Sequence, residues 1–138
     1  MADDGWVSVP RQERVVHQWE EDDSTIWVVF AKTFGSERIL LRFPEDPAYR
    51  HHNGRFHAFA THLGHGEMSL IVQKKESPSA PSANREISYQ DGDSGRWVRE
   101  RHIETDEYHY VLRVSLPTDS ASLYRQFIDS FEIERSAK

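Results

Sequence analysis

The alternation of apolar and polar positions predicts a chain built mainly of β-strands. The clearest signal is residues 25–43, where two runs of β-branched and aromatic residues flank Gly35-Ser36, a pattern typical of a hairpin. With those two residues in the turn, Phe30 lies opposite Leu41 and the apolar side chains share one face, which fixes the register. Weaker strand patterns come earlier, at residues 6–9 and 13–20.

A second hairpin is predicted from residues 55–63 and 67–75, which follow an Asn-Gly turn signal. We expect Gly64-His65-Gly66 to form a three-residue loop between them. Counting back from that loop places Ala60 opposite Leu70. The small alanines of this face leave room for a large element such as a helix.

The next segment, residues 76–95, is rich in Ser, Pro, Gly and Asp. Such a composition predicts a long flexible loop, with a short strand at residues 86–89. A third hairpin then follows from residues 96–103 and 108–116. Its second arm alternates well, so we expect one buried face formed by Tyr108, Tyr110, Leu112, Val114 and Leu116.

After Pro117 the apolar spacing changes to three and four residues, which predicts an amphipathic helix over 118–130. Residues 131–134 indicate a last short strand. The fold class is therefore α+β: one domain over 1–138, with an antiparallel sheet of six to seven strands and the C-terminal helix packed on one face. We expect the helix to bury Leu123, Tyr124, Phe127 and Ile128 against Ala58, Ala60, Tyr110 and Leu112.

Composition narrows the functional classes. The chain has 138 residues and no cysteine, so disulfides and cysteine-containing metal sites are excluded. Its formal charge is −6, and this acidic balance disfavours nucleic-acid binding. No apolar run reaches the roughly 18 residues that a membrane span requires. The first residues lack the basic and apolar pattern of a signal peptide. We therefore expect a cytoplasmic protein, and a removed export leader is left open; a bacterial source is implied only by the family resemblance given below.

Five of the eight histidines lie within residues 51–67. A metal site would have to be built from His52, His57, His62 and His65. His57 and His62 are five positions apart on one predicted strand, so they point to opposite faces and cannot both bind one metal. The pattern therefore favours a strand and its turns. A metal site completed by His17, His102 or His109 remains the alternative.

A cluster of basic residues occurs on the predicted strand before the third turn. Arg99 and Arg101 share a strand face, next to His102, and could contact an anion or a protein partner. The simpler interpretation is that they balance nearby acidic residues. No nucleophile elbow, glycine-rich phosphate loop or dinucleotide fingerprint occurs, so the sequence assigns no catalytic residue and no cofactor.

Three stretches together resemble a known family. They are ILLRFPEDP at 39–47, FHAFATHLGHGEMSLIVQ at 56–73, and the strand and helix of YHYVLRVSLPTDSASLYRQFIDSFEIE at 108–134. This order is similar to the PsbP-like α/β sandwich, which includes photosystem II extrinsic proteins and a Ran-binding nuclear import factor. The resemblance implies an antiparallel sheet flanked by helices, and binding rather than catalysis.

The sequence thus favours a non-catalytic binding or assembly module over an enzyme. Its partner would be an unknown protein or a second copy of the chain, bound through a sheet edge or the helix–sheet face. One alternative is a small metal-dependent enzyme using the histidines of 51–67. The other is a ligand carrier whose pocket is lined by Trp6, Trp19, Trp27 and Trp97.

Overall fold

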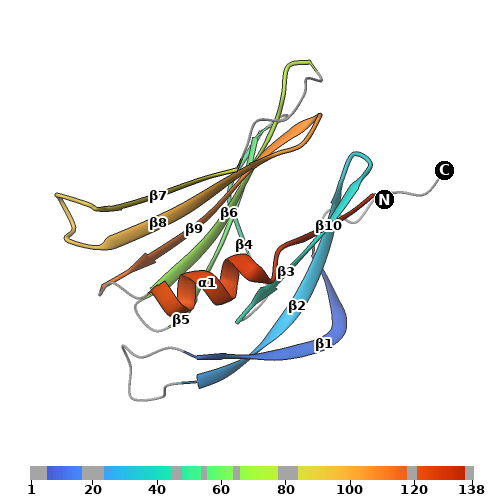
Figure 1. The fold of residues 1–138 in the computed structure, drawn as a ribbon. Coiled ribbons are helices and arrows are strands. Elements are labelled where there is room, and N and C mark those ends of the chain that lie inside the picture. Colours follow the sequence, from blue (N-terminus) through green and yellow to red (C-terminus); the bar gives the residue numbers. More distant parts are fainter. Residues whose placement is uncertain are drawn as a thin grey trace. The chain divides into compact units, whose positions relative to one another are not determined.

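The computed structural model describes residues 6–16, 24–44, 48–53, 56–63, 66–77, 84–117 and 121–135. The chain divides into two compact units (Figure 1). The first unit is Met1–Pro47 with Ala121–Lys138, and the second is the continuous segment Ala48–Ser120. Each is described by itself, and the expectation of a single domain stays a prediction.

The first unit contains a four-stranded antiparallel sheet and one helix. Its strands follow the order β1-β2-β3-β10. Their bounds are Val7–Val16 for β1, Ser24–Phe34 for β2, Glu37–Phe43 for β3 and Glu132–Arg135 for β10. The first and last strands of the chain's described part therefore lie in one sheet, which the 131–134 signal alone did not reveal.

The β2–β3 hairpin has the predicted register. Phe30 lies opposite Leu41 and Val28 opposite Phe43. Gly35 has a φ of 60°, a left-handed conformation that glycine adopts without a Cβ clash. The two-residue turn therefore determines which side chains share a face. Phe43 is fully buried and packs edge-on against Phe127 at a ring distance of 5.7 Å.

The predicted helix is confirmed as α1, Ala121–Asp129. Its apolar residues Leu123, Tyr124, Phe127 and Ile128 are all buried. The helix contacts β1 and β3 of its own unit. The residues that we expected beneath it, Ala58, Ala60, Tyr110 and Leu112, belong to the second unit.

Two side chains hold the C-terminal end of α1 to β3. The Arg42 guanidinium Nε donates to the carbonyl of Gln126 at 3.0 Å and the guanidinium also pairs with Glu13. A cation is favourable there because helix carbonyls at this end are unpaired and partly negative. Ser130 Oγ accepts from the backbone N–H of Arg42 at 3.2 Å and donates to the carbonyl of Phe127 at 2.7 Å.

The second unit is a six-stranded antiparallel sheet in the order β4-β5-β6-β9-β8-β7. The bounds are Ala48–Asn53 for β4, Phe56–Leu63 for β5, Gly66–Lys74 for β6, Arg85–Gln90 for β7, Trp97–Glu104 for β8 and Tyr108–Leu116 for β9. The predicted buried face of β9 is confirmed, because its five alternating residues are all at most 7% exposed.

The predicted register of the second hairpin was wrong by one residue. Leu63 pairs with Gly66, so two residues separate the strands instead of three, and Leu70 lies opposite Phe59 rather than Ala60. A shift of one position moves every side chain of a strand to the other face. Phe59 and Thr61, and not the alanines, therefore share the face of Leu70.

The described part of the segment 76–95 contains a longer strand than we predicted. Residues 85–90 form β7, longer than the expected 86–89 strand, and pair along their whole length with β8. Residues 78–83 lie outside the described part of the chain. The described strands number ten, in two sheets, with one short helix. The fold is thus antiparallel and β-rich, and the predicted single sheet of six to seven strands was wrong. Among these residues, no helix is long and apolar enough to span a membrane.

Candidate functional site

A buried carboxylate lies on one face of the six-stranded sheet, on the strand next to the β7 edge. Glu100 on β8 is 6% exposed. Arg113 Nε of the neighbouring β9 donates to one carboxylate oxygen at 2.8 Å, and the Tyr89 hydroxyl of β7 donates to the same oxygen at 3.3 Å. Three adjacent strands position this group, because residues paired across antiparallel strands project from the same face.

Two histidines extend this network. His102 Nε2 lies 3.0 Å from the other carboxylate oxygen of Glu100, and His102 Nδ1 lies 3.1 Å from His109 Nε2. His102 follows Glu100 by two positions on β8, and His109 lies on β9. The sequence shows this alternation, but only the strand register brings the two imidazoles together.

The protonation of the network follows from these contacts. Burial acts to raise the pKa of Glu100, but the hydrogen bond from His102 and the charge of Arg113 outweigh it, so the pKa lies below its usual value. Burial lowers the pKa of His109, and the neighbouring His102 lowers it further. Burial and the Glu100 charge raise the pKa of Tyr89. Near neutral pH the network therefore holds an ionised Glu100 and a neutral His109.

A cavity of about 430 Å³ adjoins the network at the end of the sheet. Its base is a row of four residues paired strand to strand, namely Phe56, Gln73, His109 and Glu104. The end of β6 supplies Lys74 to the wall, and the segment after β6 supplies Lys75 and Glu76. The Lys75 ammonium lies 3.5 Å from the Glu104 carboxylate. All of these residues belong to the second unit.

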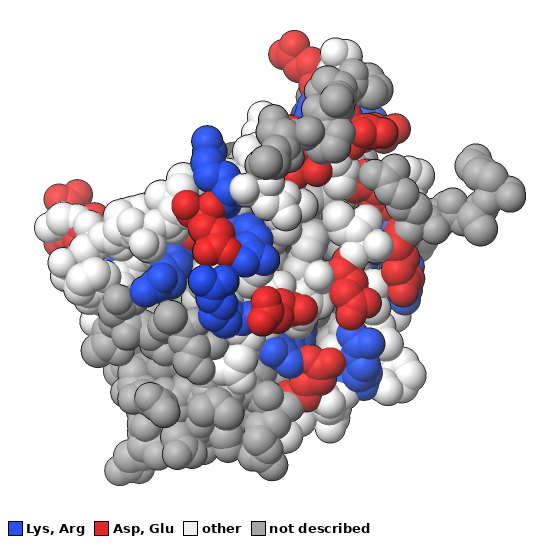
Figure 2. Space-filling view, viewed as in Figure 1, with Lys and Arg blue, Asp and Glu red and all other residues white. Residues whose placement is uncertain are grey.

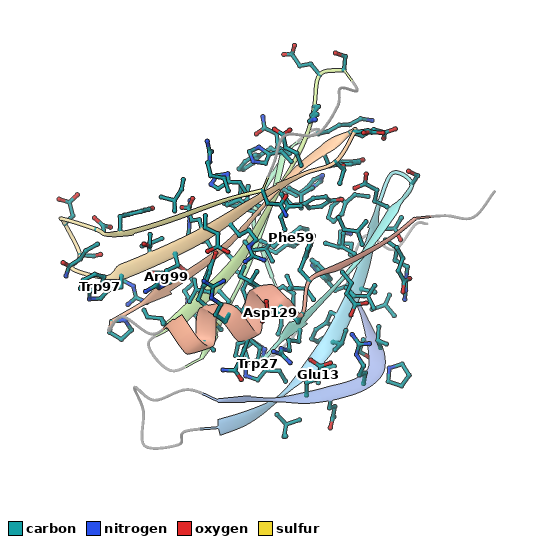
Figure 3. All side chains as sticks on the ribbon, in the orientation of Figure 1. Glu13, Trp27, Phe59, Trp97, Arg99 and Asp129 are labelled. Carbon is teal, nitrogen blue, oxygen red and sulfur yellow. The ribbon has the colours of Figure 1, made fainter. Side chains whose placement is uncertain are left out.

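The outermost strand of the same sheet is exposed on both faces. Every residue of β7 is exposed, including Ile87 at 38% and Tyr89 at 44%. Trp97 at the start of β8 is exposed as well, and Figure 3 labels it near Arg99 at that end of the strand. Among the described strands, β7 is therefore an edge strand that carries exposed apolar side chains.

The predicted metal ligands do not converge among the described residues. His52 pairs with His57 across β4 and β5. His62 lies on the opposite face, and its Nε2 is 3.4 Å from a carboxylate oxygen of Glu67. His65 lies outside the described residues, as does His17. Within the described part of the chain, no group of three or more His, Asp or Glu could hold a metal ion.

The predicted anion contact is divided between the two faces of β8. Arg99 and Arg101 alternate with His102 along the strand, so they project from the opposite face. Arg101 Nε donates to Glu86 of β7 at 2.9 Å. His102 belongs instead to the Glu100 network. In the view of Figure 2, acidic and basic side chains are intermixed, as this pairing across strands implies.

The sequence analysis missed Tyr89, Glu100, Lys75 and Glu104 as members of a site. A signal was available: Glu100, His102 and Glu104 recur at every second position of β8, and Arg113 and His109 of β9 lie opposite Glu100 and Glu104. Reading that signal requires the register of three strands. A scan against protein-family models, a search of curated proteins and a search of solved structures each found no match to this chain.

Proposed function

We propose that this chain is a non-catalytic assembly module that associates with a second copy of itself by pairing β7 with β7. The observation that carries the proposal is the exposed, regular edge at β7. Its six residues pair with β8 without any register shift and are all exposed. An edge strand presents a row of backbone donors and acceptors that another strand can bind.

The other described edges are protected in ways that β7 is not. The pairing of β1 and the pairing of β4 each contain a register shift, which bends an edge away from partners. The edge strand β10 pairs over only four residues, three of them charged. By contrast, β7 has no bulge, lysine or proline, and its Ile87 and Tyr89 are exposed.

The sequence of β7 is complementary to itself in one antiparallel register. With Ile87 opposite its own copy, Arg85 of each chain lies opposite Tyr89 of the other, and Glu86 lies opposite Ser88. A guanidinium over a tyrosine ring is a favourable cation–π contact. Such a two-fold pairing closes on itself and would give a dimer rather than a fibre. Membership of the PsbP-like family of binding proteins, which the sequence pattern resembles, is likewise part of what we propose.

Sedimentation velocity over a concentration series tests the proposal. We expect the protein to dimerise, and Ile87→Lys to be monomeric because two ammonium groups would then face each other at the centre of the pairing. Ile26→Lys is the matched control, since Ile26 is also exposed but lies on β2, an interior strand of the other sheet. It should dimerise as the unmodified protein does.

A protein that stays monomeric up to about 1 mM would refute the proposal, because its association free energy would then be weaker than about −4 kcal/mol. Equal weakening by Ile26→Lys and Ile87→Lys would also refute it, since the β7 edge would not be the contact.

A further inference from the structure

The cavity beside His109 has the size and the polar groups of a small-molecule site. Its volume of about 430 Å³ falls within the range of roughly 300–1,000 Å³ that ligand pockets occupy. Phe56 contributes an aromatic surface, and Gln73 a side-chain amide with both a donor and an acceptor. These features occur at the end of the sheet, separate from the proposed association edge, so the inference does not rest on the proposed function.

The charges of the cavity wall are balanced. Lys74 and Lys75 supply two ammonium groups, while Glu76 and Glu104 supply two carboxylates. Lys75 and Glu104 already form a pair whose side chains are only 15% and 28% exposed. A ligand with a single charge that binds one member of this pair competes with the other. A ligand with both charges can bind Lys75 and Glu104 at once. The ion pair between these two side chains is then replaced by two ion pairs with the ligand.

We propose that this cavity binds a small zwitterion with an apolar group, of the amino-acid class: its carboxylate on Lys75, its ammonium on Glu104 and its apolar group on the Phe56 ring. The structure supports this class over a simple anion because acidic and basic groups line the wall in equal number. The site is confined to the second unit, a continuous segment of the chain.

His109 makes the binding depend on pH. Ionised Glu100 accepts a hydrogen bond, so His102 Nε2 must carry a proton. When His102 is neutral, its Nδ1 has no proton and His109 Nε2 must donate to it. The remaining ring nitrogen of His109, Nδ1, is then an acceptor for an ammonium N–H of the ligand.

Protonation of His109 removes this acceptor. Both ring nitrogens of a charged imidazole carry protons, so Nδ1 then becomes a donor toward the ligand. The other charged groups that act on His109 are Glu104, Arg85 and Lys75. Glu104 favours the charged imidazole, whereas Arg85, Lys75 and His102 oppose it. Binding of the ammonium should therefore weaken as the pH falls.

The first test compares three probes in calorimetric titrations of the full chain: L-phenylalanine, 3-phenylpropionate and 2-phenylethylamine. 3-Phenylpropionate lacks the ammonium group of phenylalanine, and 2-phenylethylamine lacks its carboxylate. We expect phenylalanine to bind at least about tenfold more tightly than either, which corresponds to about 1.4 kcal/mol. Equal affinity for 3-phenylpropionate would overturn the zwitterion assignment in favour of an anion site. No binding of any probe at about 10 mM would overturn the site itself.

Two further measurements locate the site. Lys75→Gln should weaken phenylalanine binding about tenfold, whereas Lys32→Gln, a control on β2 of the first unit, should not change it. Amide shifts on titration should concentrate at Phe56, Gln73 and His109, a readout that does not depend on any variant folding. Shifts confined to other residues would overturn the assignment. Between about pH 7 and pH 5 phenylalanine keeps both charges, so an affinity that does not change over that range would refute the role of His109.

Discussion

Replacing Glu100 by glutamine should destabilise the second unit far more than a surface carboxylate does. Glutamine keeps the shape of the side chain but removes its charge. Its amide nitrogen also presents donors where Arg113, His102 and Tyr89 need an acceptor. The change therefore leaves a buried network without the anion that holds it together.

The magnitude follows from the exposure of the partners. Removing one member of a fully buried ion pair costs about 3–5 kcal/mol. Here Glu100 is buried, but the Arg113 side chain is 39% exposed and can recover hydration. Hydrogen bonds to a charged group contribute about 1.5–3 kcal/mol each. With this solvent screening, we expect a loss of about 2–3 kcal/mol in the free energy of unfolding.

Urea denaturation followed by far-UV circular dichroism measures this loss. The matched control is Glu86→Gln, on the neighbouring strand, because Glu86 also pairs with an arginine but its side chain is 38% exposed. We expect that control to cost less than about 1 kcal/mol. If Glu100→Gln costs no more than Glu86→Gln, the network contributes nothing beyond an ordinary surface pair and the reasoning fails.

The pH dependence gives an independent check. The folded-state pKa of Glu100 is depressed, so its contribution to stability is present above the unfolded value of 4.5 and is lost as the pH falls through the folded value. The stability difference between the protein and Glu100→Gln should therefore be constant from about pH 7 to pH 5.5 and shrink below that. A difference that persists undiminished into strong acid would contradict the role of the charge.

Three further outcomes are expected. Gly95→Ala should cost about 1 kcal/mol because Gly95 has a φ of 74°, whereas Gly92→Ala in the same turn should be nearly neutral; neither added Cβ meets an atom within 4 Å, so urea denaturation isolates the backbone effect. Ser130→Ala should cost about 1–3 kcal/mol and speed amide exchange at Arg42, whose N–H loses its acceptor; unchanged exchange would contradict this. Tyr89 should ionise above 10.0 in an ultraviolet titration, and less far above it in Glu100→Gln, since the carboxylate charge is one cause of the shift; an unchanged pKa in the variant would refute that cause.

The fold could be predicted from the sequence where a turn was unambiguous. Gly35-Ser36 allowed only a two-residue turn, and the β2–β3 register was predicted correctly. Gly64-His65-Gly66 offered two glycines as the end of the loop, and choosing the wrong one reversed both faces of β5. Local turn chemistry therefore determined whether the burial pattern of a whole strand could be predicted.

The candidate site was less accessible to prediction. Strand β7 lies in a segment rich in turn residues, where the sequence predicted only a short strand at 86–89. Its six residues are all exposed, so no buried face indicated which strand it pairs with. Without β7 and its pairing to β8, Tyr89 cannot be placed beside Glu100. Predicting the cavity requires the pairing of still more strands, because its base comes from four strands that are not all neighbours in sequence.

The position of β10 has a consequence for synthesis on the ribosome. It pairs with β3 by placing Glu132 opposite Leu40, so the paired residues are 92 positions apart in the sequence. At about 5–20 residues per second, the outer edge of β3 waits roughly 5–20 s for its partner. The second unit, a continuous segment between them, can complete all of its strand pairings first. The nascent chain therefore carries an open β3 edge until β10 has been synthesised, and this edge is where a chaperone or a neighbouring nascent chain would bind.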